Sequence, residues 1–155
     1  MKLFTLMILI LGCFLSAPLF AQGDADFSKI REAMQKEKDT IIASDMNLTE
    51  SEGKSFWPLY KEYQEALNKI QDRSFKLIAG YAREREKETF SDEKAKALVE
   101  EYLDIEREKL WLKKAYSEKF GKILPPKKVM RYFQLENKVA AMTDCQISQE
   151  VPLAK

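Results

Sequence analysis

An apolar stripe with heptad spacing, between Leu48 and Tyr81, constrains the fold of this chain more than any other feature. Thr49 can cap the N-terminus of a helix, and Glu52, three residues later, can bind its backbone amide in return. From this capping box, residues recur at alternating steps of four and three: Phe56, Tyr60, Tyr63, Leu67, Ile70, Ser74, Leu77 and Tyr81. Such a stripe stabilises a helix only when other helices cover it, so the rest of the chain must supply them.

A second long helix is predicted to begin after Ser91. Phe90 and Ser91, followed by Asp92 and Glu93, repeat the pattern of an apolar residue, a hydroxyl cap and acids in the first turn. The helix carries a stripe of Ala95, Leu98, Tyr102, Ile105, Lys109, Leu112 and Tyr116, flanked by Val99, Leu103 and Leu110. A short connection between two long amphipathic helices favours an antiparallel hairpin.

Two further helices flank this hairpin in the sequence. The first is predicted from near Asp26 to about Ser44, and the last from Pro126, at its first position, to about Ser148. Gly121 is expected just past the end of the helix before it. The predicted fold is all-α: an elongated antiparallel helical hairpin clasped by two further helices.

Pro58 lies past the first turn of the 48–81 helix, where a proline removes one backbone hydrogen bond. We therefore expect a bend beside Phe56, Trp57 and Tyr60. These aromatic side chains either fill the core or line a binding surface. The sequence favours the core and leaves the binding surface open.

The first 21 residues are interpreted as a cleaved signal peptide. Lys2 precedes an uncharged apolar run, and Leu19-Phe20-Ala21 before Gln22 forms an acceptable cleavage site. Residues 22–155 then form a single all-helical domain in the periplasm. The alternatives are a lipoprotein with its lipid on Cys13 and a retained N-terminal anchor.

Composition argues against nucleic-acid binding. The chain carries 26 basic and 25 acidic residues, and removal of Lys2 with the signal peptide makes the two counts equal. Cys145 is the only cysteine after residue 21, so no disulfide can form within the processed chain. Cys145 is interpreted as a small apolar residue on a helix face, with an intermolecular disulfide or a reactive thiol as alternatives.

The residues present do not form a recognisable catalytic or cofactor site. The chain has no histidine, glycine-rich phosphate loop or GxSxG turn. Acidic residues gather on the helix after Ser91, but they alternate with lysines and are expected on a solvated face: Glu100, Glu101, Asp104, Glu106 and Glu108. Glu136, on an apolar stripe, is expected to snorkel at an edge or to pair with a lysine or arginine rather than act as an acid catalyst. We therefore predict no enzyme, metal or cofactor.

Charge is distributed unevenly along the second half of the chain. Residues 92–108 lean acidic, whereas residues 109–131 are basic apart from Glu118 and include Trp111 and Tyr116. A mixed basic and aromatic surface suits unfolded chains or anionic lipid headgroups. The alternative is that basic residues are there because they favour the C-terminal half of a helix.

Two helix-opening motifs resemble those of a known family. Leu48-Thr49 with Glu52, and Phe90-Ser91 with Lys94, are similar to the LTxxQ motifs of Spy/CpxP-type periplasmic proteins. Residues 56–60 (FWPLY) and 124–138 (LPPKKVMRYFQLENK) resemble a group of uncharacterised exported helical bacterial proteins. The Spy/CpxP resemblance implies ATP-independent binding of unfolded or aggregating proteins, or damping of an envelope-stress sensor.

The predicted function is a non-enzymatic, chaperone-like binding protein. Its partners would be unfolded or partly folded proteins, with one envelope sensor or membrane complex as the alternative; a homodimer and contact with a membrane surface stay open. The predicted client-binding residues are aromatic grips and basic residues that steer the encounter: Phe56, Trp57, Tyr60, Trp111 and Tyr116, then Lys113, Lys114, Lys127 and Lys128.

Overall fold

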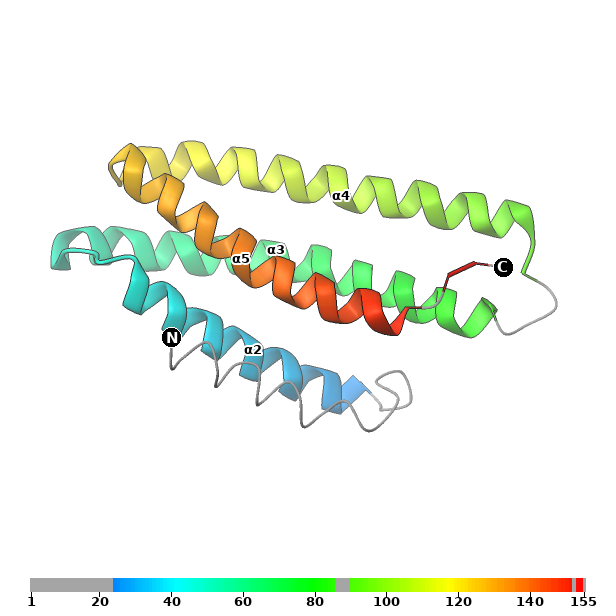
Figure 1. Ribbon diagram of the computed structural model, residues 1–155. Coiled ribbons are helices and arrows are strands. Elements are labelled where there is room, and N and C mark those ends of the chain that lie inside the picture. The colour runs from blue at the N-terminus through cyan, green and yellow to red at the C-terminus, as the bar shows by residue number, and fades with distance from the viewer. Residues whose placement is uncertain (1–23, 86–89, 152, 155) are drawn as a thin grey trace. The chain divides into compact units, whose positions relative to one another are not determined.

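The computed structural model describes residues 24–85, 90–151 and 153–154. The predicted signal peptide lies outside these residues. The described part contains four helices, α2 (Asp24–Asp45), α3 (Glu50–Arg85), α4 (Asp92–Gly121) and α5 (Pro126–Glu150), and no strand (Figure 1). The all-α fold class is therefore confirmed.

Both predicted capping motifs form at helix starts. The Thr49 amide donates to Glu52 Oε2 at 2.7 Å, and the Glu52 amide donates to Thr49 Oγ1 at 3.3 Å, which is the reciprocal capping box. Ser91 caps α4 by accepting a hydrogen bond from the Lys94 amide at 3.4 Å. Helix α3 continues through Pro58, whose side chain is exposed. The bend expected at this proline stays a prediction.

Helices α3 and α4 form the predicted antiparallel hairpin. Lys119 on α4 binds Glu62, near the start of α3, with Nζ 2.8 Å from Oε1. At the other end, Lys94 binds Glu84 with Nζ 3.0 Å from Oε2. Because the residue number falls along α4 as it rises along α3, the two helices run in opposite directions (Figure 1).

Helix α5 runs back along the hairpin, parallel to α3 and antiparallel to α4. The Gln64 side-chain amide donates to the Tyr132 hydroxyl at 3.3 Å. Beyond the end of α5, the Arg85 side chain donates to the Leu153 carbonyl oxygen at 3.2 Å. Residue numbers therefore rise together along α3 and α5. Helix α5 thus takes the place predicted for the last helix.

The chain divides into two compact units, Met1–Asp45 and Met46–Lys155. Helix α2 belongs to the first unit, and the three helices described above belong to the second. Asn47, in the segment after α2, adopts the left-handed region with φ of 46°, which asparagine tolerates better than most residues. That α2 clasps the hairpin stays a prediction.

The C-terminus of α4 differs from the prediction. Gly121 is the last helical residue rather than the one beyond it, and Lys122 ends the helix with φ of −80° and ψ of −18°. The Lys122 and Ile123 amides instead donate to carbonyl oxygens three residues back, at 3.2 and 3.1 Å. Tightened bonds of this kind satisfy the last carbonyls without a left-handed glycine. Pro126 begins α5 as predicted.

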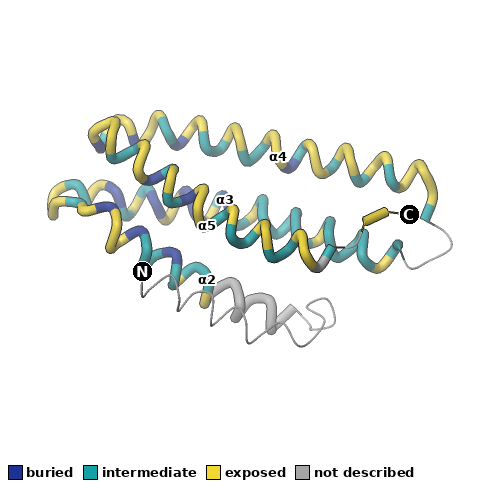
Figure 2. The backbone as a smooth tube through the Cα atoms, in the orientation of Figure 1, coloured by how far each residue is buried: buried dark blue, intermediate teal, exposed yellow. Residues whose placement is uncertain are grey.

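Aromatic side chains build the core of the second unit. Burial is concentrated in the first half of α3 and where α4 leads into α5 (Figure 2). Tyr63 lies at the centre of the cluster, with its ring centroid 5.1 Å from Tyr116 and 6.1 Å from Tyr132. Each buried ring removes a large apolar area from water, and edge and tilted contacts add to this. The cluster consists of Phe56, Tyr60, Tyr63, Tyr116, Phe120, Tyr132 and Phe133.

One part of the stripe predicted for α4 is wrong. Tyr102 was placed on the packing face, and Val99, Leu103 and Leu110 were placed on its flanks. The structure exposes all four, at 52–64% of their surface. Ile105, by contrast, is fully buried as expected. Helix α4 is therefore apolar on two faces, only one of which packs against α3.

Gly80 offers a direct test of helix propensity in α3. A Cβ atom at this position would meet nothing within 4 Å. We expect Gly80→Ala to raise the free energy of unfolding by about 0.5–1 kcal/mol, because glycine loses more backbone entropy in a helix than alanine. Urea denaturation followed by circular dichroism measures this. Gly121→Ala, at the last residue of α4, should raise the stability less. A lower stability of Gly80→Ala would show that the added methyl group does meet a neighbour.

Candidate functional site

Three of the aromatic residues predicted to bind clients are buried. Phe56, Tyr60 and Tyr116 are 0%, 2% and 6% exposed. Their rings pack within the aromatic cluster, so a client cannot reach them in this conformation. The interpretation that aromatic residues near Pro58 fill the core is therefore confirmed for Phe56 and Tyr60. A client-binding role for the three residues stays a prediction that this conformation does not support.

The two tryptophans lie in different environments. Trp57 is half-buried, with its ring edge-on to Phe56 and Tyr60 at centroid distances of 5.1 and 5.4 Å. Trp111 is 64% exposed, and the Arg107 guanidinium lies over its ring at 5.8 Å. Trp111 is thus the predicted aromatic grip that is most accessible to a partner.

The four predicted lysines differ in their exposure and in their contacts. Lys114 and Lys127 are exposed, and the Lys113 ammonium donates to the Asn137 side chain at 3.2 Å. Lys128 instead serves the fold, because its ammonium donates to the Asn47 carbonyl oxygen at 2.9 Å and to the Glu52 carboxylate. Lys128 therefore ties the start of α5 to the capping box of α3.

A candidate interaction surface lies on the outer face of α4. We use this name for four large apolar side chains that are each more than half exposed and lie on the side of α4 away from Ile105: Val99, Leu103, Leu110 and Trp111. Tyr102 is also exposed, but it lies half a turn away from Trp111 and is not part of this face. Helical spacing places Val99, Leu103 and Leu110 on one side of the helix. Along α4, most residues are exposed or half-exposed (Figure 2). The signal was present in the sequence as steps of four and seven, but a packing stripe gives the same steps.

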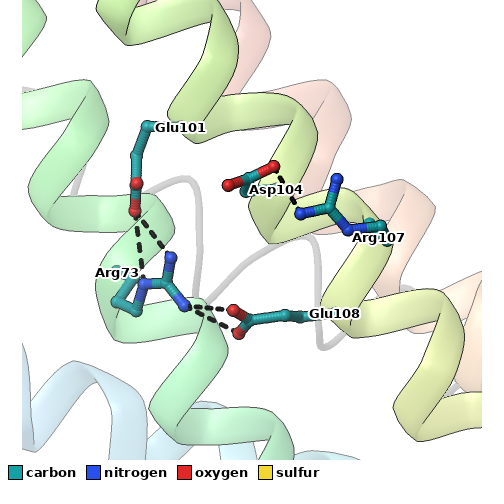
Figure 3. A network of polar contacts seen from close by, with 5 residues as sticks. All are labelled: Arg73, Glu101, Asp104, Arg107 and Glu108. Atoms are coloured by element: carbon teal, nitrogen blue, oxygen red, sulfur yellow. Dashed lines mark hydrogen bonds and ion pairs between the residues drawn. The ribbon is translucent and has the colours of Figure 1, made fainter.

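Away from the aromatic cluster, ion pairs join the packed face of α4 to α3. Arg73 of α3 lies between two carboxylates of α4 (Figure 3). Its guanidinium contacts both oxygens of Glu108 at 2.7 Å and donates to Glu101 at 2.7 Å. These hydrogen bonds raise the pKa of Arg73, with Glu108 the larger cause. Glu101 and Glu108 therefore pair with α3, although their side chains stay 44% and 42% exposed.

The hydroxyl of the buried Tyr116 takes part in a polar contact between α3 and α4. Its hydroxyl donates to Glu62 at 2.7 Å, and the Lys119 ammonium both binds Glu62 and lies 4.2 Å from the Tyr116 ring. These hydrogen bonds, that from Lys119 first, lower the pKa of Glu62. The three side chains hold the hairpin together near the aromatic cluster.

A buried hydrogen bond joins α3 to α5 beside the aromatic cluster. The Gln64 side-chain amide donates to Glu136 Oε1 at 2.9 Å, and Glu136 is only 4% exposed. The expectation that Glu136 snorkels at an edge is therefore wrong, whereas its pairing with a basic residue stays a prediction. Nearby, the buried Tyr63 hydroxyl has no hydrogen-bond partner among the described residues. Burial and the charge of Glu136 raise the pKa of Tyr63.

Within the described residues, no group of three or more acidic, cysteine or histidine side chains could hold a metal ion. No helix among them is long and apolar enough to span a membrane. Cys145 is exposed, and its thiol accepts a long contact of 3.9 Å from the Gln149 side chain.

No family model matches the chain, and neither a curated protein nor a solved structure matches it.

The tyrosine hydroxyls of the cluster allow a matched comparison. Tyr63→Phe should leave the free energy of unfolding unchanged or raise it by up to about 1 kcal/mol, because it removes a buried polar atom that lacks a partner. Tyr132→Phe removes the hydroxyl that accepts from Gln64 and should lower the stability by about 1 kcal/mol. Equilibrium denaturation of both variants tests this. Equal losses in the two would show that the Tyr63 hydroxyl is satisfied in solution.

The capping box predicts an acid-sensitive start of α3. Hydrogen bonds, that from Lys128 first and then that from the Thr49 amide, lower the pKa of Glu52 below its ordinary value of 4.5. The stabilisation is fully present above that value and is lost as the pH falls through the lowered pKa. We expect the urea concentration at the midpoint of denaturation to decrease as the pH is lowered from 5 to roughly 3. In Glu52→Gln this fall should be smaller; an unchanged pH profile would contradict the role of Glu52.

Proposed function

We propose that this protein is a non-enzymatic, ATP-independent binding protein for unfolded or aggregation-prone polypeptides. The observation that carries the proposal is the outer face of α4, where the large apolar side chains of Val99, Leu103, Leu110 and Trp111 are each more than half exposed. Soluble proteins rarely expose apolar side chains side by side in a large patch unless the patch meets a partner. The proposal also includes a periplasmic location and draws on the resemblance of the helix-opening motifs to those of Spy/CpxP-type proteins.

The chemistry of this face suits a loosely defined client. Trp111, Leu110 and Leu103 offer apolar contact without a pocket of fixed shape. Lys114, near the same end of α4, adds positive charge that attracts acidic segments. A convex helix face of this kind makes contacts that do not depend on one client sequence, which suits a chaperone-like role.

The test is suppression of client aggregation. A chemically denatured, unrelated protein is diluted into buffer containing the purified protein without ATP, and light scattering is followed as the molar ratio rises. Leu110→Ser combined with Trp111→Ser should raise the ratio needed for half suppression about tenfold, because two exposed apolar contacts with the client are lost. Circular dichroism checks that the fold is unchanged.

Met130→Ser is the matched control, because Met130 on α5 is 63% exposed but lies outside the outer face of α4. It should suppress aggregation as the wild type does. Suppression that persists undiminished in the α4 double variant would overturn the site. A wild-type protein that suppresses no client would overturn the function and favour a single partner, such as an envelope sensor.

A further inference from the structure

The first half of α5 exposes positive charge on one side. Helical spacing places Lys127, Arg131 and Lys138 on the side of α5 away from the buried Glu136, and all three are exposed. Residues 122–143 include one acidic residue, Glu136, which is 4% exposed. We use the name basic face of α5 for the exposed side chains on this side of the helix: Lys127, Met130, Arg131, Gln134 and Lys138.

The neighbouring helices add to this charge rather than cancel it. The Lys113 ammonium of α4 donates to the Asn137 side chain at 3.2 Å, which brings a fourth cation to the edge of the basic face. On α3, the Glu52 carboxylate is bound by the Lys128 ammonium. The basic face therefore attracts negatively charged partners.

Met130 adds an apolar side chain to the row of cations. It is 63% exposed and lies between Lys127 and Arg131 in the sequence. Lys127 and Lys138 are separated by a rise of about 16 Å along the helix. Long basic side chains can reach lipid phosphates, while an exposed methionine enters the boundary between headgroups and acyl chains.

We propose that the basic face of α5 binds the surface of a membrane that contains anionic lipids. Charge complementarity selects this partner, because anionic headgroups form a broad negative surface that meets the whole row of cations at once. A folded acidic protein would instead have to match the spacing of the row. Each lysine or arginine near such a surface strengthens binding about fivefold, so the contact is peripheral and reversible.

This inference goes beyond the proposed function and does not depend on it. The basic face of α5 and the outer face of α4 share no residue. Membrane binding through α5 therefore does not use Leu110 or Trp111, which are proposed to bind clients. The membrane assay contains no client and the aggregation assay contains no lipid, so either proposal can fail without the other.

Co-sedimentation with lipid vesicles tests the inference. The purified protein should bind vesicles of phosphatidylcholine mixed with phosphatidylglycerol at least about a hundredfold more tightly than vesicles of phosphatidylcholine alone. Raising the salt concentration from about 0.1 M to about 1 M should remove most of this difference, because exposed charges are then screened. Arg131→Gln combined with Lys138→Gln should weaken binding to the anionic vesicles roughly 25-fold.

Two control variants separate local charge from net charge and from packing. Lys69→Gln combined with Lys76→Gln removes the same charge from two exposed lysines of α3 and should bind as the wild type does. Arg131→Lys combined with Lys138→Arg keeps both charges and should also bind as the wild type does. Circular dichroism checks that each variant is folded.

Three outcomes would overturn the inference. The first is equal binding of the wild type to neutral and anionic vesicles. The second is an equal loss in the α5 glutamine variant and its α3 control, which would show that only net charge matters. The third is displacement from the vesicles by soluble polyglutamate at equal charge concentration, which would replace the membrane by an acidic polypeptide as the partner.

Discussion

The aromatic cluster is the interaction on which the rest of the described structure depends. Tyr63 of α3, Tyr116 and Phe120 of α4 and Tyr132 of α5 come together at the end of the hairpin where α4 leads into α5. Buried aromatic area supplies most of the driving force that holds three helices in one unit. The capping box, tied to α5 by Lys128, fixes where the first of these helices begins.

Away from this cluster the hairpin is held differently. No residue of α3 beyond Leu67 is fully buried, and there Arg73 joins the helices through two carboxylates of α4. Partly exposed ion pairs add little stability but fix register and direction, because each charge accepts few alternative partners. The hairpin is therefore well packed at the end that holds the aromatic cluster and is joined by ion pairs elsewhere. Along its length, α4 leaves its outer face exposed. That face is what a partner can use.

The predictions from the sequence succeeded where a local signal had one structural meaning. Thr49 with Glu52, Ser91 before two acids, and Pro126 after Pro125 each fix a helix start through hydrogen bonds or a fixed φ angle. The predictions failed where several outcomes share one pattern. Gly121 fits either the left-handed residue after a helix or the last residue within it, and the terminal hydrogen bonds decided between them.

The sequence by itself determined the helices, their caps and the antiparallel hairpin, because periodicity and capping act within one or two turns. It could not determine which aromatic residues are accessible. Tyr102 and Tyr116 lie on the same predicted stripe, yet the first is 52% exposed and the second only 6%. Only the packing of α3 against α4 and α5 made that difference, since burial depends on which face of each helix meets its neighbours.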